Sequence, residues 1–317
     1  MTSNIIVYMP AFNEGETIFK VLNSINIKRT NVNVEYLVVD DGSTDNTVIE
    51  AKKANATVVS HRYNKGVGKA FETAIEYALN NKVDVLVSID ADGQFDVNQI
   101  DEFLNTILDD QADFCIGNRF SKSKPEKMPF AKYWGNKQMN KIISFIGKEK
   151  IEDASCGFRA YSKKALLNLN LQGQFTYTHE VILDLLDKGF RVNQIPVNVI
   201  YFEDRVSRIA NNLFSYAFRS LMIIFKCYKD YKPLNFFLSI ASLVLLTSLA
   251  GGFFVLYNWF TVGSISPYKS IGIISLALLG ISILLTIFAF LADMLNRIRR
   301  NQEKILYLSK QKYFDKN

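Results

Sequence analysis

The stretch VLVSIDADGQ, residues 85–94, joins an apolar run directly to two carboxylates. An apolar, β-branched run that ends in a polar, Gly-containing turn is typical of a buried strand. Asp90 and Asp92, one residue apart at a strand end, can converge on one hard divalent cation, and Gln94 can add a neutral oxygen. Because an Asp-x-Asp pair is also common in solvated turns, its place in the fold decides between a metal site and a turn.

Short β-branched runs alternate with amphipathic stretches from the N-terminus to about residue 120. The runs predict strands at Ile5–Met9, Glu35–Asp40, Ala56–Ser60, Val83–Ile89 and Asp113–Ile116. The stretches between them predict helices at Glu16–Ile27, Asp45–Asn55, Gly68–Asn80 and Asn98–Asp109. Such alternation predicts an α/β domain with a mostly parallel sheet and helices on both faces.

Polar residues gather where three of these strands end. The clusters are Pro10–Glu14, Asp40–Ser43 and Asp90–Gln94. Ligands of parallel α/β sheets bind at the carboxyl ends of the strands, so the clusters predict one shared cleft. The Gly-rich turn Asn64–Ala70 leads into a helix and could bring backbone amides and Lys65 towards a phosphate. It lacks the ending of a Walker loop, and the chain has no Gly-x-Gly-x-x-Gly dinucleotide motif.

Two uncharged stretches near the C-terminus change the class of protein that the composition suggests. The 317 residues are 49% hydrophobic and carry a net charge of +6, averages that exclude disorder and fit a soluble enzyme. Leu234–Phe260 and Ile271–Ala292, however, contain no charged residue over 27 and 22 positions. As helices they would extend roughly 40 and 33 Å, enough to cross a hydrocarbon core of about 30 Å. We therefore expect a membrane anchor of two spans.

The positive charge is concentrated at the C-terminal end. Seven basic residues there stand against Glu303 and Asp315, a net charge of +5 that leaves about +1 for the rest of the chain. They are Arg297, Arg299, Arg300, Lys304, Lys310, Lys312 and Lys316. The loop between the spans, Thr261–Ser270, holds only Lys269. The positive-inside rule places the N-terminal domain and the tail in the cytoplasm, and the charge gives no reason to expect nucleic acid as a partner.

Two stretches that mix apolar and basic residues, Phe130–Ile146 and Arg208–Tyr231, predict helices that lie in the membrane interface. Ordinary core helices with solvated lysines are the alternative. The start of the chain has neither the basic region nor the apolar core of a signal peptide. Cys115, Cys156 and Cys227 are odd in number and widely spaced, as expected in a reducing compartment.

The motifs PAFNE (10–14), DDGSTD (40–45), NKG with Ala70 (64–66) and DADGQ (90–94) resemble those of family 2 glycosyltransferases in order and spacing. The resemblance covers about residues 4–210, where GNR (117–119) and CGFR (156–159) continue it. The chain is most similar to polyprenyl-phosphate sugar synthases of the dolichyl-phosphate mannose synthase and bactoprenol glucosyltransferase type. The resemblance implies a GT-A fold and an inverting hexosyltransferase that uses a UDP- or GDP-linked sugar.

The resemblance also implies roles for individual residues. Those at the nucleotide sugar would be Pro10, Ala11, Asn13, Glu14, Asp41, Lys65, Gly66, Asp90, Ala91 and Asp92. Asp90, Asp92 and Gln94 would hold Mg²⁺ or Mn²⁺, which neutralises charge on the leaving diphosphate. Candidates for binding the acceptor phosphate are Arg119, Lys132, Arg205, Ser207 and Arg208. The candidate catalytic residues are Asp92, Arg119 and Glu180.

The acceptor decides the mechanism. The oxygen of a polyprenyl phosphate is already anionic at neutral pH, so its attack on the anomeric carbon needs little or no general base. The alternative acceptor, a hydroxyl group of a glycolipid or glycan, needs a base such as Glu180. A third hypothesis is a non-catalytic membrane scaffold, although the intact metal motif argues against it. Two spans are too few for the pore of a processive polysaccharide synthase.

The sequence departs from the family pattern at two places. Cys156 stands where the family often has Ser. The segment Arg205–Arg208 keeps the pair of Ser207 and a basic residue but lacks the Gly that many relatives carry. The two histidines, His61 and His179, are interpreted as structural or surface residues.

We expect four segments: a cytoplasmic GT-A catalytic domain at 1–207, interfacial amphipathic helices at 208–233, a two-span anchor at 234–292 and a basic cytoplasmic tail at 293–317. The protein would then be a multi-pass protein of the cell membrane. Its partners would be a nucleotide sugar, polyprenyl phosphate and the membrane. Spacing arguments do not identify the sugar or the base, and a homo-oligomer is as compatible with the anchor as a single chain.

Overall fold

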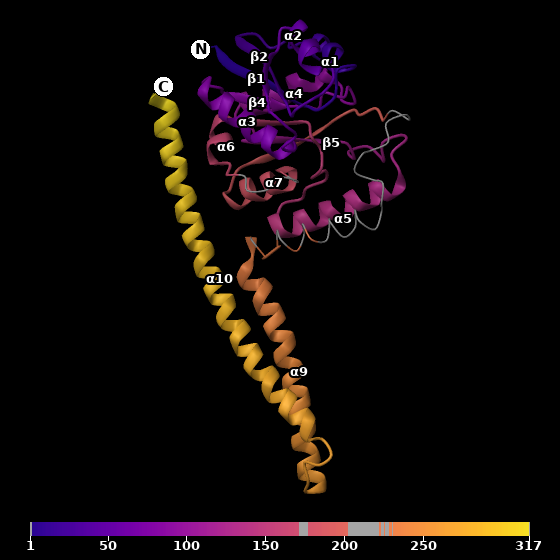
Figure 1. Cartoon of the computed structure of the whole chain (residues 1–317), viewed down its shortest axis with the longest axis vertical. Helices are drawn as coiled ribbons and strands as arrows, with labels where there is room; N and C mark the ends of the chain where they lie inside the picture. The colour runs from indigo at the N-terminus through magenta and orange to yellow at the C-terminus, as the bar shows by residue number, and fades with distance from the viewer. Residues whose placement is uncertain are drawn as a thin grey trace. The chain divides into compact units, whose positions relative to one another are not determined.

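The computed structural model describes residues 2–170, 177–201, 222, 225, 228–229 and 231–316. The chain divides into two compact units, one of residues 1–220 with 303–317 and the other of residues 221–302. The first unit contains a sheet with its covering helices, and the second contains the long apolar helices (Figure 1). All the motifs singled out in the sequence belong to the first unit.

A seven-stranded sheet forms the centre of the first unit (Figure 1). Its strands are β1 (Ser3–Ala11), β2 (Val32–Asp40), β3 (Thr57–Ser60), β4 (Val85–Ser88), β5 (Phe114–Asn118), β6 (Arg159–Ser162) and β7 (Val192–Pro196). Their order is β3-β2-β1-β4-β6-β5-β7, and only the two pairs that involve β6 are antiparallel. The predicted mostly parallel sheet is confirmed, and β6 and β7 are additional to the five predicted strands.

Helices connect most of the strands. Those described in the first unit are α1 (Ile18–Ser24), α2 (Thr47–Lys53), α3 (Val67–Asn80), η1 (Val97–Gln99), α4 (Ile100–Leu108), α5 (Phe130–Gly147), α6 (Lys163–Asn168) and α7 (Tyr177–Asp187). The four predicted helices correspond to α1–α4. Helices α1 and α2 begin two residues later than predicted. The reason is local, because the side chains of Thr17 and Asp45 make loop contacts at the helix starts.

Aromatic side chains pack the helices onto the sheet. On one face, Phe71 of α3 lies against the rings of Tyr8, Tyr161 and Tyr177, with centroid distances of 4.7 to 6.1 Å. All four side chains are buried. Each buried ring of this size contributes roughly 1.5–3 kcal/mol to stability. On the opposite face, α4 packs against β4, β5 and β6.

The carboxyl ends of β1, β2 and β4 lie at one edge of the sheet. In the register, Ala11 pairs with Asp40 and Tyr8 pairs with Ser88. The Asp41 N–H continues the pairing by donating to the Ala11 carbonyl oxygen at 2.8 Å. The polar residues that follow these strands are therefore neighbours in space, as predicted from the sequence.

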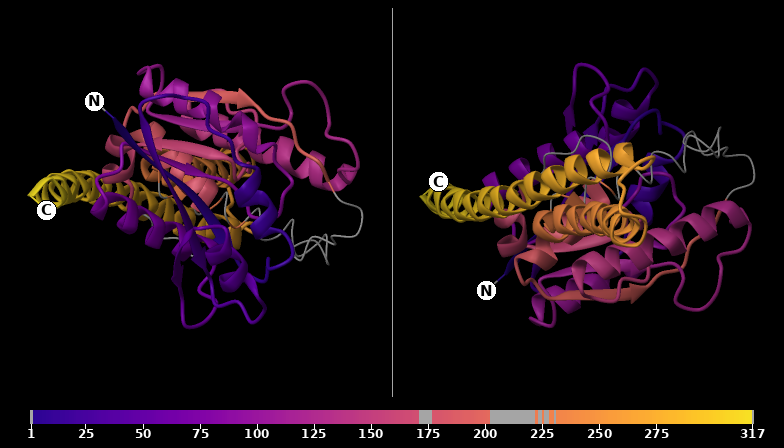
Figure 2. Two further views of the ribbon diagram at one scale, coloured as in Figure 1. Left: turned by 90° about the horizontal axis from the view of Figure 1, so that it is seen from above. Right: turned by 90° about the horizontal axis from the view of Figure 1, so that it is seen from below.

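The second unit is built on α9 (Pro233–Val262) and on α10 (Lys269–Lys316), whose last turns belong to the first unit. The two helices lie side by side (Figures 1 and 2). Both are long and apolar enough to cross a membrane. The prediction of two such helices is confirmed, and most of their large apolar side chains are exposed, as expected for contact with lipid.

A seam of small side chains joins α9 to α10. The buried residues of the seam recur at seven-residue spacing and are Ala241, Ser248 and Val255 on α9 and Ser275, Ser282 and Ala289 on α10. The Ser248 hydroxyl donates to the Ser275 carbonyl oxygen across the seam at 2.7 Å. Seven-residue spacing is that of left-handed helix packing, and small residues allow helices to approach closely in a membrane.

Helix α10 is longer than the span predicted from hydropathy. The uncharged stretch ends at Ala292, but the helix continues to Lys316. The continuation contains no Gly or Pro, and an ion pair of 2.8 Å between Arg297 and Asp293 supports its first turn. The charged C-terminal segment is thus helical rather than an irregular tail.

Candidate active site

Asp90 and Asp92 follow β4 at the edge where the strand ends meet. Asp90 is partly buried, and this burial together with the Asp92 carboxylate raises the pKa of Asp90 to about 6. The charges of Arg119 and Arg159 act in the opposite direction, and Glu14 adds to the increase. These groups therefore lie within electrostatic range of Asp90, so that predicted donor-side and acceptor-side residues share one site.

Hydrogen bonds hold the acidic turn in place. The Asp92 carboxylate accepts from the Gln94 backbone N–H at 3.0 Å. The Thr17 hydroxyl lies 2.9 Å from the Ala91 carbonyl oxygen and 3.1 Å from a carboxylate oxygen of Glu14. Thr17 thus links the Glu14 loop to the turn that carries both aspartates.

The segment after β1 is locked onto the segment after β2. The Asn13 N–H donates to the Ser43 hydroxyl, and the Asn13 side-chain oxygen accepts from the Thr44 N–H, both at 2.9 Å. The Glu14 N–H donates to the Thr47 hydroxyl at 2.9 Å. Asn13 has a φ of 57°, a left-handed conformation that Asn adopts more readily than most residues. The DDGSTD motif therefore positions the loop that carries Glu14.

Asp41 braces the Gly-rich turn before α3. Its buried carboxylate accepts from the Lys65 N–H at 2.9 Å and the Gly66 N–H at 2.7 Å, and it lies 2.7 Å from His61 Nδ1. The other ring nitrogen of His61 lies 3.0 Å from the Thr73 hydroxyl on α3. Asp41 and His61 together fix the position of Lys65 and Gly66. A contact of Asp41 with a ribose or base stays a prediction.

Two cations face the acidic pair. Arg119 forms a bidentate ion pair with the fully buried Asp153: Nε lies 2.7 Å from Oδ2, and Nη2 lies 2.8 Å from Oδ1. Arg119 also donates to the Tyr201 hydroxyl at 3.1 Å, and Lys132 Nζ lies 5.1 Å from the centre of the Tyr201 ring. Burial and the charge of Arg119 lower the pKa of Lys132, whereas the Asp92 carboxylate raises it. Arg119 and Lys132 therefore share one electrostatic environment with Asp92.

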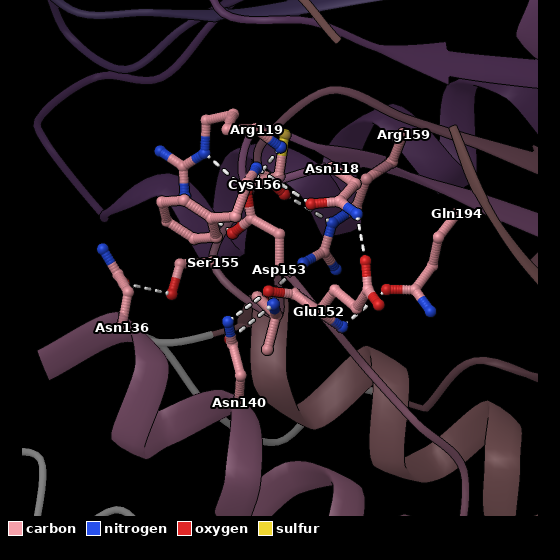
Figure 3. Close-up of polar contacts among 12 residues, drawn as sticks. Asn118, Arg119, Asn136, Asn140, Glu152, Asp153, Ser155, Cys156, Arg159 and Gln194 are labelled. Carbon is pink, nitrogen blue, oxygen red and sulfur yellow. Dashed lines mark hydrogen bonds and ion pairs between the residues drawn. The ribbon is translucent and has the colours of Figure 1, made fainter. Parts of the chain in front are cut away.

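The loop Glu152–Gly157, called the hub loop below, connects the parts of the site (Figure 3). The Glu152 carboxylate accepts from the Asn118 side chain at the end of β5 at 2.6 Å. The Glu152 N–H donates to the Gln194 side chain on β7, also at 2.6 Å. Through Asp153 the same loop holds Arg119. Arg119 is thus connected through the hub loop to two strands, β5 and β7.

Helix α5 holds the other side of the hub loop (Figure 3). Asn140 accepts from the Ala154 N–H at 2.9 Å and donates to the Glu152 carbonyl oxygen. One turn earlier, Asn136 accepts from the Ser155 hydroxyl at 2.8 Å. Both asparagines are buried. Sequence reasoning missed them, because polar residues on a helix of mixed character look like its solvent-facing side.

Gly157 brings the hub loop against the acidic turn. A Cβ atom at this position would lie 2.7 and 2.8 Å from the two carboxylate oxygens of Asp90. Real Cβ atoms essentially never approach oxygen so closely, so only Gly fits without moving Asp90. In the CGFR motif, Gly157 is therefore required because the space beside the Asp90 carboxylate has no room for a side chain.

His179 lies on α7 beside the hub loop and is buried. Its Nε2 lies 3.5 Å from the Ser155 hydroxyl. Burial and the charge of Arg159 lower the pKa of His179 to about 4, whereas Asp153 acts in the opposite direction. The ring is therefore neutral at physiological pH, which agrees with its interpretation as a structural histidine.

Because His179 takes up a proton more readily in the unfolded chain, stability is expected to fall below pH 6.5. The sign follows from the lowered pKa of about 4 in the folded protein: its contribution is complete above pH 6.5 and is lost on acidification. Between pH 7 and pH 5 the loss amounts to about 2 kcal/mol. His179→Gln should remove this part of the pH dependence, measured by denaturant unfolding of the full chain in detergent. Parallel pH profiles of the two proteins would contradict it.

The structure gives positions for some of the remaining predicted site residues but not for others. Pro10 and Ala11 end β1, and Ala91 lies between the two aspartates. Glu180 is half-buried in the first turn of α7, two residues after Thr178. Three acceptor candidates lie outside the residues that the structure describes and are Arg205, Ser207 and Arg208. Residues 208–221 of the second predicted interfacial stretch also lie outside them.

The acidic pair fits a divalent cation that is shared with a substrate. Burial is the main cause of the raised pKa of Asp90 and the Asp92 carboxylate adds to it, and a cation between the two carboxylates would relieve their repulsion. Among the described residues there is no group of three or more His, Cys, Asp or Glu side chains that could hold a metal ion. Mg²⁺ and Mn²⁺ suit such a sparse oxygen site, because substrate phosphates and water complete their coordination.

The fold has a GT-A-like architecture, and the chain is a glycosyltransferase. The chain belongs to glycosyl transferase family 2, whose family model matches residues 6–169. The UDP-N-acetylglucosamine–dolichyl-phosphate N-acetylglucosaminyltransferase of Methanococcus voltae is 30% identical over 242 residues, which cover 69% of this chain and 95% of the relative. The polyprenol monophosphomannose synthase of Mycolicibacterium smegmatis is 27% identical over 222 residues, with coverage of 67% and 83%.

A solved structure supports the fold. Glucosyl-3-phosphoglycerate synthase from Mycobacterium tuberculosis, in complex with Mn²⁺, UDP and glucosyl-3-phosphoglycerate, matches with a TM-score of 0.54 and 20% identity. The match covers 70% of this chain and 80% of the synthase. The GT-A fold implied by the sequence motifs is thereby confirmed.

Proposed function

We propose that the protein transfers a sugar from a UDP- or GDP-linked donor to polyprenyl phosphate, in an inverting and metal-dependent reaction at the cytoplasmic face of the membrane. One observation carries the proposal: a carboxylate pair suited to a metal–diphosphate complex shares its site with two partly buried cations, Arg119 and Lys132. The first feature suits the donor and the second suits an anionic acceptor. The Methanococcus voltae relative is named for a UDP-sugar and dolichyl phosphate, and the Mycolicibacterium smegmatis relative is named for a polyprenol monophosphomannose, which supports this pairing of substrates.

On the donor side, Asp90 and Asp92 would hold Mg²⁺ or Mn²⁺, and Gln94 would contribute its side-chain oxygen. The metal would neutralise charge on the leaving diphosphate. Glu14 and the turn with Lys65 and Gly66 flank the same strand ends and would bind the nucleotide. Their loops are fixed by Asp41, His61 and the DDGSTD motif before any ligand binds. This preorganisation lowers the entropy cost of aligning the donor.

On the acceptor side, Arg119 would bind the lipid phosphate. Asp153 holds the guanidinium from one side, and the pKa of Arg119 is raised well above its usual value, chiefly by this hydrogen-bonded ion pair acting against burial. Arg119 stays charged and keeps its orientation, and Lys132 adds a second positive charge. A phosphate oxygen placed there is already ionised, so positioning replaces general-base catalysis.

The surface of α5 suits a membrane interface. Its exposed aromatic side chains are Phe130, Trp134 and Phe145, which are 71%, 57% and 71% accessible to solvent. They lie at helical spacing with Lys137 and Lys141. Aromatic rings and lysines on one face are typical of helices that bind at the lipid headgroups. Such a helix would keep Lys132, on the same element, near the headgroup of a lipid acceptor.

The arrangement of the segments is part of the proposal. Residues 1–207 would form the cytoplasmic catalytic domain, 208–233 would lie in the interface, 234–292 would form the anchor, and 293–317 would return to the cytoplasm. The two long apolar helices and the excess of basic residues after the second one support this topology.

The test is an assay with membranes that contain the full chain. Labelled UDP-glucose, UDP-N-acetylglucosamine and GDP-mannose are each incubated with polyprenyl phosphate and Mn²⁺ or Mg²⁺. One labelled polyprenyl-phosphate sugar is expected, and its formation should stop when the metal is chelated. Label in diacylglycerol or in a glycan, without the lipid-phosphate product, would refute the proposal.

Glu180→Gln separates the two acceptor chemistries. If the acceptor is a phosphate, the variant should keep turnover within about threefold of the wild type, because no proton has to be removed. If the acceptor is a hydroxyl group, loss of the base should lower turnover by about 10²-fold or more. Glu76→Gln, the same change at an exposed position of α3, is the matched control.

A further inference from the structure

Arg159 is a fully buried arginine in the first position of β6. Its backbone pairs with Ser88 of β4 on one side and Ile116 of β5 on the other. The sheet therefore fixes where the side chain starts. A buried arginine needs a partner for its charge and donors, since burying them unpaired is costly.

The Arg159 guanidinium donates to three backbone carbonyl oxygens. Nη2 contacts Ala154 at 2.9 Å, Nε contacts Cys156 at 2.8 Å, and Nη1 contacts Thr178 at 2.8 Å. Two of these carbonyls belong to the hub loop, and the third belongs to the first turn of α7. One rigid planar group thus joins the sheet, the hub loop and α7.

The residues held in this way lie beside functional groups. Ala154 follows Asp153, which orients Arg119, and Cys156 precedes Gly157, which contacts Asp90. Thr178 precedes His179, which lies beside Ser155 in the hub loop. A shift of the hub loop would therefore move both Arg119, the proposed acceptor-side cation, and Gly157, which packs against Asp90.

We propose that Arg159 is a positioning residue that sets the acceptor-side half of the site by clamping the hub loop and the first turn of α7 to β6. The inference rests on the proposed function, because it assigns Arg119 to acceptor binding. Arg159 contacts no substrate in this account and acts through Asp153 and Gly157.

The clamp should affect the two substrates unequally. The proposed nucleotide-binding elements are fixed by their own contacts, those of Asp41 with Gly66 and of Asn13 with Ser43. None of those contacts involves the hub loop. Weakening the clamp should therefore spare nucleotide binding and impair acceptor binding and turnover, whereas general loss of structure would impair all three.

The experiment compares Arg159→Lys with the wild type in the full chain. Lysine keeps the charge but has no planar fork, so it cannot hold three carbonyls in the same arrangement. We expect the KM for polyprenyl phosphate to rise about 10- to 100-fold, with a fall in kcat. Binding of UDP and of GDP, each titrated without a divalent metal so that Asp90 does not contribute, should stay within about threefold of the wild type for the nucleotide that binds.

Hydrogen exchange provides a readout that does not depend on activity. Amides of residues 153–158 and 177–181 should exchange faster in Arg159→Lys, while those of residues 61–69 should be unchanged. Arg191→Lys, a change at a half-exposed arginine that pairs with Asp113, is the matched control and should alter neither region. Arg159→Gln serves as the second variant if Lys at this buried position prevents folding.

The outcomes separate the two proposals. A wild-type chain that makes no polyprenyl-phosphate sugar would refute the proposed function, while the exchange data would still decide whether Arg159 clamps the loop. Unchanged exchange at 153–158 together with an unchanged acceptor KM would overturn the role of Arg159. Equal losses of nucleotide and acceptor binding would also overturn it, since they indicate a purely structural residue.

Discussion

Replacing Asp92 by Asn is expected to lower turnover by about 10²–10³-fold without unfolding the protein. The change removes one of two carboxylates that fit a divalent cation, while an amide oxygen of the same size can still accept from the Gln94 N–H. The measurement is the initial rate of sugar transfer at saturating donor, in Mg²⁺ and in Mn²⁺. Thermal unfolding of the same preparation reports whether the fold is kept.

Asp96→Asn is the matched control, because Asp96 lies in the same segment and accepts from the Asn98 N–H at the start of η1. It should leave turnover within about twofold, since an Asn side chain also serves at such a helix start. An Asp92→Asn variant with the wild-type rate in Mn²⁺ would mean that the metal binds elsewhere.

Gly157→Ala should lower turnover by about 10²-fold or more, although it adds only a methyl group. The new Cβ would overlap both carboxylate oxygens of Asp90, so either the aspartate or the hub loop has to move. Both movements displace groups that the proposed mechanism requires. Steady-state kinetics of sugar transfer with separate determination of nucleotide affinity would measure the effect.

Gly252→Ala provides the comparison for this change, because a Cβ at Gly252 would meet no atom within 4 Å. It should be nearly silent. If Gly157→Ala were equally silent, Asp90 would have room that the structure does not show, and its close packing against the hub loop would not matter for catalysis.

The parts of the fold with local signals could be predicted from the sequence. The five predicted strands and four predicted helices follow from hydrophobic periodicity, which acts over a few residues. The shared edge of β1, β2 and β4 follows from the rule for parallel sheets. Strand β6 escaped prediction because it inserts antiparallel between β4 and β5, a pairing that depends on residues far apart in the sequence.

In the site, too, residues in local motifs could be predicted, whereas residues that act through distant contacts could not. Asp90 and Asp92 stand in a recognisable motif, and the structure places them where the motif predicts. The supporting residues carry no such signal, because their function depends on non-local contacts. Asn140 looks like a surface residue in the sequence, yet it holds two groups of the hub loop. Arg159 belongs to a motif, but only the three carbonyl contacts reveal what it does.

The contacts of Asp41 give a further example. A carboxylate at a strand end suggests a ligand contact, and the motif suggests a nucleotide. In the structure its oxygens meet two backbone N–H groups and an imidazole ring. Much of the hydrogen-bonding capacity of a motif residue can therefore serve the loop around it.

The seam between α9 and α10 has a consequence for how freely the residues of these two helices can vary. The Ser248 hydroxyl of α9 donates to a backbone carbonyl oxygen of α10, so the two helices associate through the surfaces that face each other. The outer surface, with exposed side chains such as Leu246 and Phe253, has only to remain apolar. Inner positions are therefore constrained in size, whereas outer ones are interchangeable among apolar residues.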